Sequence, residues 1–307
     1  MPRRQPFTAL CQHAANLARP ALADLHTHTL ASDGEFTASQ IVAFAVQAGL
    51  KAVAITDHDT TAGFAEAEAA IRANRSPIEL IPGVELSTFW DDREYHLLAY
   101  FVRPDVAFQE MLRQLQEARE RRFQQFRQLL RERGLSLIES NWDHLAVSTP
   151  SLGRRHVARE LVRAGVVRRL HDAFRHFVLP LSGQVDRLRV ISLRDALDRV
   201  RAAGGVASLA HPSAEFSRDQ LTVLRDWGLG GVEVQFPAVT YSRSLELRAW
   251  AGELGLGCTG GSDCHGPERR VGCRTIPMHD LLRFRQSATS AGCAGGGDRT
   301  PSVELRN

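Results

Sequence analysis

The chain has 307 residues, a length that corresponds to two domains of ordinary size or to one large α/β barrel. Hydrophobic residues make up 43% of it and charged residues 24%, a globular composition that excludes a disordered, collagen-like or coiled-coil protein. No apolar run approaches the roughly 18 residues of a membrane span, and residues 5–16 contain no apolar core of a signal peptide. We therefore expect a cytoplasmic protein that does not associate with membranes.

The five cysteines are odd in number and form no Cys-x-x-Cys pair, so reduced thiols are predicted rather than disulfides or a structural zinc site. The net charge of +3 is unevenly distributed, because residues 103–175 contain 15 Arg, no Lys and nine acidic residues. This local excess of positive charge indicates anionic partners, although most of these arginines are expected on a solvated helical face.

Residues 22–102 alternate short apolar runs with amphipathic segments, the pattern of βαβ units around a parallel sheet. Thr37 and Gln40 form a capping box, which predicts a helix that begins there and ends at Gly49. The predicted strands of this part are 22–25, 52–55, 79–81 and 96–100.

Residues 103–190 have a different pattern. Asp105 is predicted to cap a helix of about 28 residues that ends at Gly134, and a second helix is expected over 152–164. The strand and helix alternation resumes at Gly205, where a second capping box is formed by Ser217 and Gln220. The later predicted strands are 206–210, 231–235 and 256–259.

These patterns predict an α/β domain formed by residues 21–102 and 191–286 and interrupted by a helical insertion or cap at 103–190. Residues 1–20 lack periodicity, and residues 287–307 include three consecutive glycines. Both ends are therefore expected to be flexible extensions.

Histidines and carboxylates follow nearly every predicted strand. His26 and His28 come after the first strand, where alternate residues point the same way, so both imidazoles can reach one ion. A single His-x-His pair also arises by chance among surface or core histidines. His96 is an exception, because it lies near the start of its apolar run. The other candidates at strand ends are Asp33, Asp57, His58, Asp59, Glu85, His211, Asp263 and His265.

In a closed parallel barrel the carboxyl ends of the strands converge on one face, where sites are built. The candidates offer nitrogen and oxygen donors, which suit Mn, Zn or Fe and disfavour a thiolate site. They exceed the needs of one ion, so two or three ions are predicted. Such clusters hydrolyse phosphate esters through a metal-bound hydroxide, and no catalytic side chain is expected. For Asp57 and Asp59, orienting a neighbour or capping a helix is an equal alternative to metal binding.

Five motifs contain most of the candidate ligands: Asp24-Leu25-His26-Thr27-His28, Thr56-Asp57-His58, Gly83-Val84-Glu85, Ala210-His211-Pro212 and Ser262-Asp263-Cys264-His265. In this order, over about residues 22–285, they resemble the motifs of the PHP (polymerase and histidinol phosphatase) superfamily. The helical insertion after His96, with Thr149-Pro150-Ser151-Leu152-Gly153-Arg154 in it, further resembles the bacterial nucleoside 3′,5′-bisphosphate phosphatases, which also act as 5′ to 3′ exoribonucleases on short RNA and in ribosomal RNA maturation.

The resemblance implies a distorted (β/α)7 barrel of the TIM-like kind and three metal ions, usually Mn²⁺, with Zn²⁺, Fe²⁺ or Mg²⁺ as alternatives. It implies a nucleotide or short RNA as substrate, and no stable protein partner is predicted. The metal ligands that it carries over to this chain are His26, His28, Asp33, His58, Glu85, His96, His211, Asp263 and His265.

The candidates for substrate binding are Arg154, Arg155 and His156, because an arginine can bind a phosphate through two parallel hydrogen bonds. Neighbouring residues on a helix diverge by about 100°, so we favour Arg154 as the residue that faces the pocket and expect solvent exposure for Arg155. For His156, contact with a base or phosphate and simple packing within the insertion are both open.

Three functions compete. The first is hydrolysis of the 3′-phosphate of nucleoside 3′,5′-bisphosphates, such as conversion of adenosine 3′,5′-bisphosphate to AMP, or release of nucleotides from an RNA 5′ end. The second is an enzyme for another small phosphomonoester, such as histidinol phosphate, or an amidohydrolase; an amidohydrolase usually carries a bridging lysine, and Lys51 is the only lysine here. The third is a non-catalytic, metal-stabilised RNA-binding module, against which the complete ligand set argues.

Overall fold

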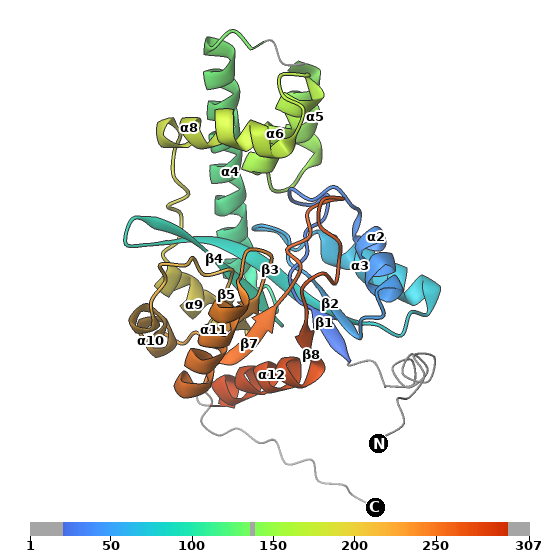
Figure 1. Ribbon diagram of the computed structural model, residues 1–307, viewed down its shortest axis with the longest axis vertical. Coiled ribbons are helices and arrows are strands. Elements are labelled where there is room, and N and C mark those ends of the chain that lie inside the picture. The colour runs from blue at the N-terminus through green and yellow to red at the C-terminus, as the bar shows by residue number, and fades with distance from the viewer. Residues whose placement is uncertain (1–20, 136–138, 294–307) are drawn as a thin grey trace, which may run out of the picture.

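An eight-stranded sheet forms the centre of the computed structural model, which describes residues 21–135 and 139–293 (Figure 1). The strands have the spatial order β7-β6-β5-β4-β3-β2-β1-β8. Their bounds are β1 Leu22–Asp24, β2 Ala52–Ile55, β3 Glu79–Trp90, β4 Arg93–Tyr100, β5 Val206–Leu209, β6 Gly231–Gln235, β7 Gly257–Gly260 and β8 Ile276–Pro277.

The sheet curves into a nearly closed barrel. Strands β1, β2 and β3 run parallel, β5, β6 and β7 run parallel, and β4 lies antiparallel between the two groups. The barrel closes where the residues after β1 meet the end of β7 and the loop that follows it: Leu25 N–H donates to Gly260 O at 3.1 Å, and Asp263 N–H donates to His26 O at 2.7 Å. The α/β barrel expected from the sequence is therefore confirmed, and antiparallel β4 accounts for its distortion.

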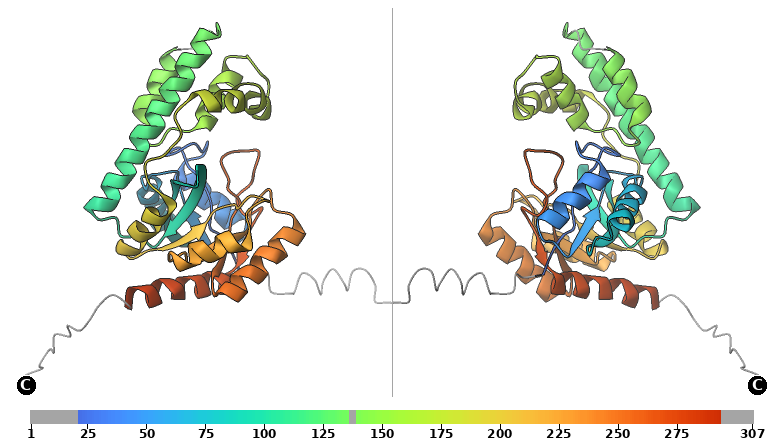
Figure 2. Two further views of the ribbon diagram at one scale, coloured as in Figure 1. Left: turned by 90° about the vertical axis from the view of Figure 1, so that its left-hand side faces the viewer. Right: turned by 90° about the vertical axis from the view of Figure 1, so that its right-hand side faces the viewer.

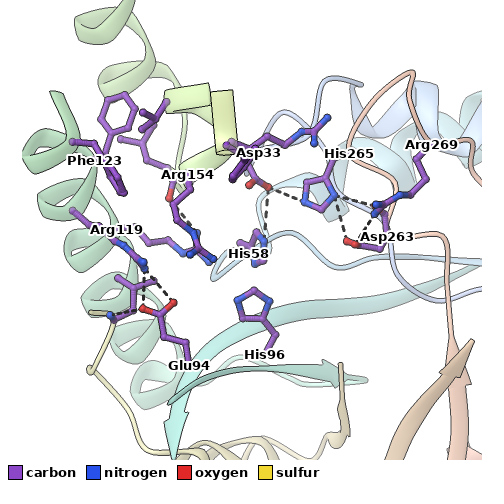
Figure 3. A pocket seen from close by; sticks show the side chains of 18 residues that line it. Asp33, His58, Glu94, His96, Arg119, Phe123, Arg154, Asp263, His265 and Arg269 are labelled. Atoms are coloured by element: carbon purple, nitrogen blue, oxygen red, sulfur yellow. Dashed lines mark hydrogen bonds and ion pairs between the residues drawn. The ribbon is translucent and has the colours of Figure 1, made fainter. Parts of the chain in front are cut away.

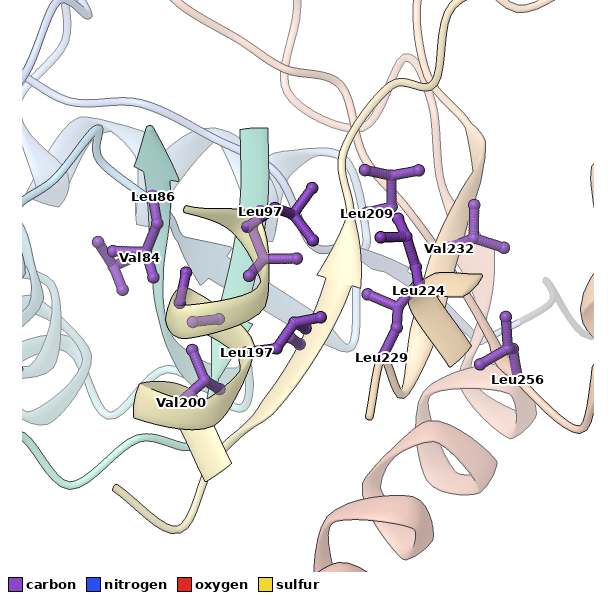
Figure 4. Packing of buried hydrophobic residues seen from close by; sticks show 14 of the residues in the cluster. Val84, Leu86, Leu97, Leu197, Val200, Leu209, Leu224, Leu229, Val232 and Leu256 are labelled. Atoms are coloured by element: carbon purple, nitrogen blue, oxygen red, sulfur yellow. The ribbon is translucent and has the colours of Figure 1, made fainter. Parts of the chain in front are cut away.

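Helices α9, α10 and α11 cover one side of this barrel and bury a large apolar cluster against β3–β7 (Figure 4). The cluster includes Leu86 and Leu97 from the sheet and Leu197 and Leu224 from the helices, all of them buried. Both predicted capping boxes are present, at the starts of α2 and α10. The helices around the barrel are α2 Ala38–Gln47, α3 Gly63–Asn74, α9 Leu193–Ala202, α10 Arg218–Asp226, α11 Tyr241–Leu254 and α12 Met278–Cys293.

The β3–β4 hairpin is longer than the two short strands predicted at 79–81 and 96–100. Its turn is formed by Asp91 and Asp92, with φ values of +47° and +60°, the left-handed geometry that joins two antiparallel strands through two residues. The apolar pattern did not reveal this hairpin because its outer half carries polar residues. Since β4 runs in the opposite direction, with His96 paired to Ser87, the start of β4 lies at the barrel face where the parallel strands end.

The residues between β4 and α9 form a second unit, here called the helical segment (residues 106–184), which stands above that face of the barrel (Figures 1 and 2). It begins with α4, Val106–Glu132, whose 27 residues extend about 40 Å. Asp105 accepts the Phe108 N–H at 2.7 Å, so the predicted helix cap is confirmed. The other elements are α5 Glu139–Ser148, α6 Arg154–Arg163, α7 Leu170–Ala173, the π-helix η1 Phe174–Val178, α8 Leu179–Leu181 and the 3₁₀ helix η2 Ser182–Gln184.

Helix α4 belongs to two apolar cores. Its first half contributes Phe108 and Leu115 to the barrel cluster, and its second half contributes Phe126 and Leu130 to a separate cluster within the helical segment. Trp142 is fully buried in this second cluster. One continuous helix therefore fixes the position of the helical segment relative to the barrel.

The C-terminal boundary differs from the prediction. Helix α12 continues to Cys293, whereas a tail was expected from residue 287; the small residues that suggested a tail include alanines, which favour a helix. The predicted extensions 1–20 and 294–307 lie outside the described residues. Within the described ranges, no helix combines the length and the apolar composition needed to cross a membrane, and Cys258, Cys264 and Cys273 are free thiols.

Candidate metal centre

The nine residues predicted as metal ligands converge at the barrel face beneath the helical segment. Most of them follow the ends of different strands, whereas Glu85 and His96 lie within β3 and β4. Within each group below the ligand atoms lie within 4.8 Å of one another. The four overlapping groups are His28, Asp33, His58 and His265; His26, Glu85 and His211; His26, His28 and Asp263; and His58, Glu85 and His96.

Glu85 lies at the centre of the cluster. Its Oε1 is 2.9 Å from Nδ1 of His96 and 3.1 Å from Nε2 of His211, and its Oε2 is 3.0 Å from Nδ1 of His58. Neighbouring ligand atoms that bind one ion at about 2.1 Å lie about 3.0 Å apart in an octahedral arrangement and about 3.4 Å apart in a tetrahedral one. These separations therefore match the shell of a metal ion.

Unsatisfied polar atoms also point to a bound cation. Oδ1 of Asp33, Oε2 of Glu85 and Nδ1 of His28 are buried and have no hydrogen-bond partner among the described residues. A buried polar atom without a partner costs about 1–3 kcal/mol, and a divalent ion would satisfy several such atoms at once. The donor set therefore fits divalent metal binding.

The cluster sets its own charge state. Burial alone would raise the pKa of Glu85, but the imidazoles of His58, His26 and His96 hold that pKa well below its usual range. Burial lowers the pKa of His58 well below its ordinary value, and the Arg119 guanidinium adds to this effect against the attraction of Glu85. The ionised Glu85 and the neutral His58 are thus in the forms that ligate a metal. For His26, His28 and His211 the nearby carboxylates outweigh burial and raise the pKa, so these imidazoles would release a proton when an ion binds.

Three residues of the site have positive φ values, namely Asp59 at +50°, His211 at +26° and Asp263 at +48°. Such backbone conformations are strained for residues other than glycine and persist only where the surroundings hold them. The backbone conformation of His211 is stabilised by a hydrogen bond from its N–H to Oε2 of Glu233 at 2.7 Å.

Asp57 and Asp59 orient their neighbours. Asp57 accepts hydrogen bonds from the Thr29 N–H at 2.7 Å and from the Ser32 hydroxyl at 2.6 Å, so it organises the turn between His28 and Asp33. Asp59 accepts the Ser87 N–H at 2.7 Å and pairs with Arg119. Neither carboxylate belongs to a candidate metal group within the described residues.

Sequence reasoning missed Arg119 and Glu233. Arg119 is buried on α4, where it also donates to the Ser87 hydroxyl at 2.7 Å and to Leu152 O at 3.2 Å. It lies four residues after Leu115, on the apolar stripe of the helix, and a charged residue on such a stripe is the signal that was available. Glu233 is likewise a fully buried charge within the apolar strand β6.

A cavity of about 240 Å³, here called the first cavity, opens between the metal cluster and the helical segment (Figure 3). Asp33, His58 and His265 line its barrel side, and Phe123 and Phe126 line its upper side. Arg154 extends into this cavity from the start of α6, toward His58 (Figure 3). Its placement agrees with the predicted orientation of Arg154.

Arg155 and His156 are engaged in other contacts. Arg155 also lines the first cavity, but its NH2 donates to Glu35 at 3.2 Å and to Glu268 at 2.8 Å, so this residue joins α6 to two barrel loops instead of lying free in solvent. His156 is buried, and its Nδ1 accepts the Gly153 N–H at 3.0 Å. His156 is not among the residues that line the first cavity. Of the two roles left open for it, its burial and its contact with Gly153 favour packing within the helical segment, where it also caps α6.

Comparison with known sequences identifies the family. The profile of the PHP domain matches residues 24–177. A 5′-3′ exoribonuclease of Haemophilus influenzae is 32% identical over 251 residues, which cover 80% of this chain and 90% of that protein. A 3′,5′-nucleoside bisphosphate phosphatase of Chromobacterium violaceum is 30% identical over 250 residues, which cover 80% of this chain and 87% of that protein.

Two solved structures have a similar fold. A chain from Bifidobacterium adolescentis assigned as a metal-dependent phosphoesterase superposes with a TM-score of 0.80 at 29% identity, covering 88% of this chain and 98% of that one. An amidohydrolase from Chromobacterium violaceum, solved with bound sulfate and without metal, superposes with a TM-score of 0.76 at 28% identity, covering 85% and 96%. The profile match and the identity to these relatives show that the chain belongs to the PHP domain family.

Proposed function

We propose that this chain is a metal-dependent phosphoesterase that removes the 3′-phosphate of nucleoside 3′,5′-bisphosphates and releases nucleotides from the 5′ end of short RNA. Its relatives are named for hydrolysis of phosphate esters. Both proposed reactions break the same bond: the oxygen of water joins phosphorus, the bond from phosphorus to the 3′ oxygen breaks, and that oxygen takes up the proton that the water releases.

The observation that carries the proposal is the position of the donor cluster at the base of the first cavity. The nine proposed ligands are His26, His28, Asp33, His58, Glu85, His96, His211, Asp263 and His265. Divalent ions held there, which we propose to be Mn²⁺, would activate water and neutralise the charge of the scissile phosphate.

The helical segment is proposed to select the substrate. Arg154 enters the first cavity beside His58 and is placed to bind the phosphate that is not cleaved. Phe123, Phe126 and Phe174 give the cavity an apolar wall that suits a nucleoside. An ester as small as histidinol phosphate would leave both features unused.

The amidohydrolase alternative requires a lysine that bridges the metal ions, and no lysine lies at the donor cluster. Lys51 is exposed and immediately precedes β2, at the end of the barrel opposite to the donor cluster. A non-catalytic RNA-binding module would have no need for nine converging ligands with unsatisfied buried atoms.

The first test measures phosphate release from nitrophenyl phosphate, AMP, adenosine 3′,5′-bisphosphate and 5′-phosphorylated oligonucleotides. Chelator-treated protein is expected to be inactive, and added Mn²⁺ is expected to restore activity with preference for the bisphosphate and the oligonucleotides. Turnover that survives exhaustive chelation, or activity confined to nitrophenyl phosphate, would disprove the proposal.

The second test concerns Arg154. Arg154→Ala should reduce transition-state binding of the bisphosphate by about 2–4 kcal/mol and leave nitrophenyl phosphate hydrolysis nearly unchanged. Arg163→Ala is the matched control, because Arg163 is exposed on the same helix and pairs with Glu160. Equal losses on both substrates would assign Arg154 to the chemical step or to folding.

A further inference from the structure

We propose that a second cavity, on the barrel rim beside the start of β4, binds the nucleotide that follows the scissile phosphate when the substrate is an RNA chain. This inference rests on the proposed function and extends it to a second binding site. The cavity has a volume of about 440 Å³.

The two cavities meet at the metal centre. Glu94, His96 and Arg154 line both of them, so a group bound at His96 can extend in either direction. The first cavity reaches under the helical segment toward Phe123 and Phe126.

The second cavity lies outside the helical segment. Of its lining residues, Arg154 is the only one contributed by that segment; the others come from β4 and from the loop after β5. A chain that occupied this cavity could therefore continue into solvent without displacing α4 or α6.

Exposure within the donor cluster agrees with access from this side. The side chains of His96 and His211, which line the second cavity, are 21% and 34% exposed. The side chains of His26 and His28 have no exposed surface. The part of the metal centre that a phosphate can reach thus faces the rim as well as the first cavity.

The chemistry of the proposed reaction gives the second cavity its role. When the 3′ oxygen leaves, its nucleoside lies on one side of the phosphorus atom, and in an RNA the next nucleoside is attached to the phosphate on the other side. A bisphosphate carries nothing there. A substrate chain therefore needs two binding regions that join at the phosphate, whereas a bisphosphate needs one.

The charges in the second cavity suit a polyanion at one position and oppose it at another. Arg93 is exposed at the start of β4 and offers a guanidinium to a phosphodiester. The carboxylate of Glu94 accepts hydrogen bonds from Arg122 at 3.0 Å and from the Leu188 N–H at 3.2 Å, so its negative charge is paired. Glu215 is a carboxylate at the same cavity and should weaken binding of a chain.

The experiment compares kcat/KM for a 5′-phosphorylated tetranucleotide with that for adenosine 3′,5′-bisphosphate. Arg93→Ala should lower the ratio of these constants about fivefold to tenfold, since one phosphate contact is lost. Glu215→Gln should raise the ratio about twofold to threefold, because it removes a like charge. Arg225 is exposed on α10 and lines neither cavity. The variant Arg225→Ala is therefore the control and should leave the ratio unchanged.

A binding measurement separates this effect from catalysis. Fluorescence anisotropy of the labelled tetranucleotide, with chelator present, should show weaker binding and a salt dependence reduced by about one unit of slope in Arg93→Ala. An unchanged ratio in both variants would overturn the second site. Wild-type protein that hydrolyses the bisphosphate but no oligonucleotide would overturn it too and leave the phosphatase proposal standing, whereas hydrolysis of neither substrate would overturn both.

Discussion

Oε1 of Glu233 lies 3.1 Å from Nδ1 of His26, and this contact determines which nitrogen of His26 faces the metal cluster. A carboxylate can only accept, so Nδ1 carries a proton and Nε2 is the nitrogen that faces the cluster, 3.3 Å from Oε2 of Glu85. The other oxygen of Glu233 accepts the backbone N–H of His211. One buried carboxylate thus positions two proposed ligands.

Glu233→Gln should lower the affinity for Mn²⁺ by about 10- to 100-fold. The amide can accept from one partner, but its NH₂ group meets an N–H donor at the other, so His26 or His211 loses its orientation. Titration calorimetry of metal-free protein measures this change. Glu253→Gln, on the exposed face of α11, should bind Mn²⁺ as the wild type does; equal affinities in all three proteins would refute the positioning role.

Arg119 should be a strong determinant of stability. Arg119→Met leaves the fully buried Asp59 without its cationic partner, and removal of one member of a buried pair costs about 3–5 kcal/mol. Urea unfolding at pH 7 measures the loss. Arg113→Met is the control on the same helix, because its pairs with Glu110 and Glu117 are exposed and screened by solvent, so its loss should leave the free energy of unfolding nearly unchanged. Similar losses in the two variants would contradict the prediction.

His156 should make the folded state sensitive to acid. Burial lowers the pKa of His156 to about 3 from its ordinary value of 6.5. Between these values the unfolded chain binds a proton that the folded chain does not, so stability is complete above pH 6.5 and is lost as the pH falls. The loss approaches about 1.4 kcal/mol per pH unit.

His156→Gln isolates this effect. A glutamine at this third helical position can still accept the Gly153 N–H, as in a capping box, but it does not titrate. The free energy of unfolding of the wild type should therefore fall relative to that of the variant between pH 6 and pH 4. A difference that is constant with pH would show that His156 is protonated equally in both states.

Cys264 should not take part in the reaction. Although it lies between Asp263 and His265, its thiol is buried and donates to Arg269 O at 2.8 Å. Burial raises the pKa of this thiol to about 11, so it is protonated at neutral pH. Cys264→Ser keeps a donor at this position and should retain kcat/KM within a few-fold of wild type. A loss above about tenfold, or 1.4 kcal/mol in the barrier, would place the sulfur in the site.

The sequence by itself determined the local features of this protein. The capping boxes at Thr37 and Ser217 depend on residues three positions apart, and they occur as predicted. The placement of His26 after β1 and of His58 after β2 could also be predicted, since parallel strands bring their carboxyl ends to one barrel face. Glu85 reaches the same face from within β3, which is longer than predicted. These inferences need only the chain direction and the spacing of residues.

Contacts between distant segments were decided by the tertiary structure alone. His96 joins the cluster because the Asp91–Asp92 turn reverses the chain direction, so that β4 runs antiparallel to β3. No periodic pattern of apolar residues in the sequence predicts this turn. Glu233 meets His26 across 207 residues and Arg119 meets Asp59 across 60. The roles of Arg154, Arg155 and His156 diverge because each leaves α6 in a different direction. A spacing pattern records which residues share a strand end, but the partner of a buried charge depends on how the barrel closes and where α4 crosses it.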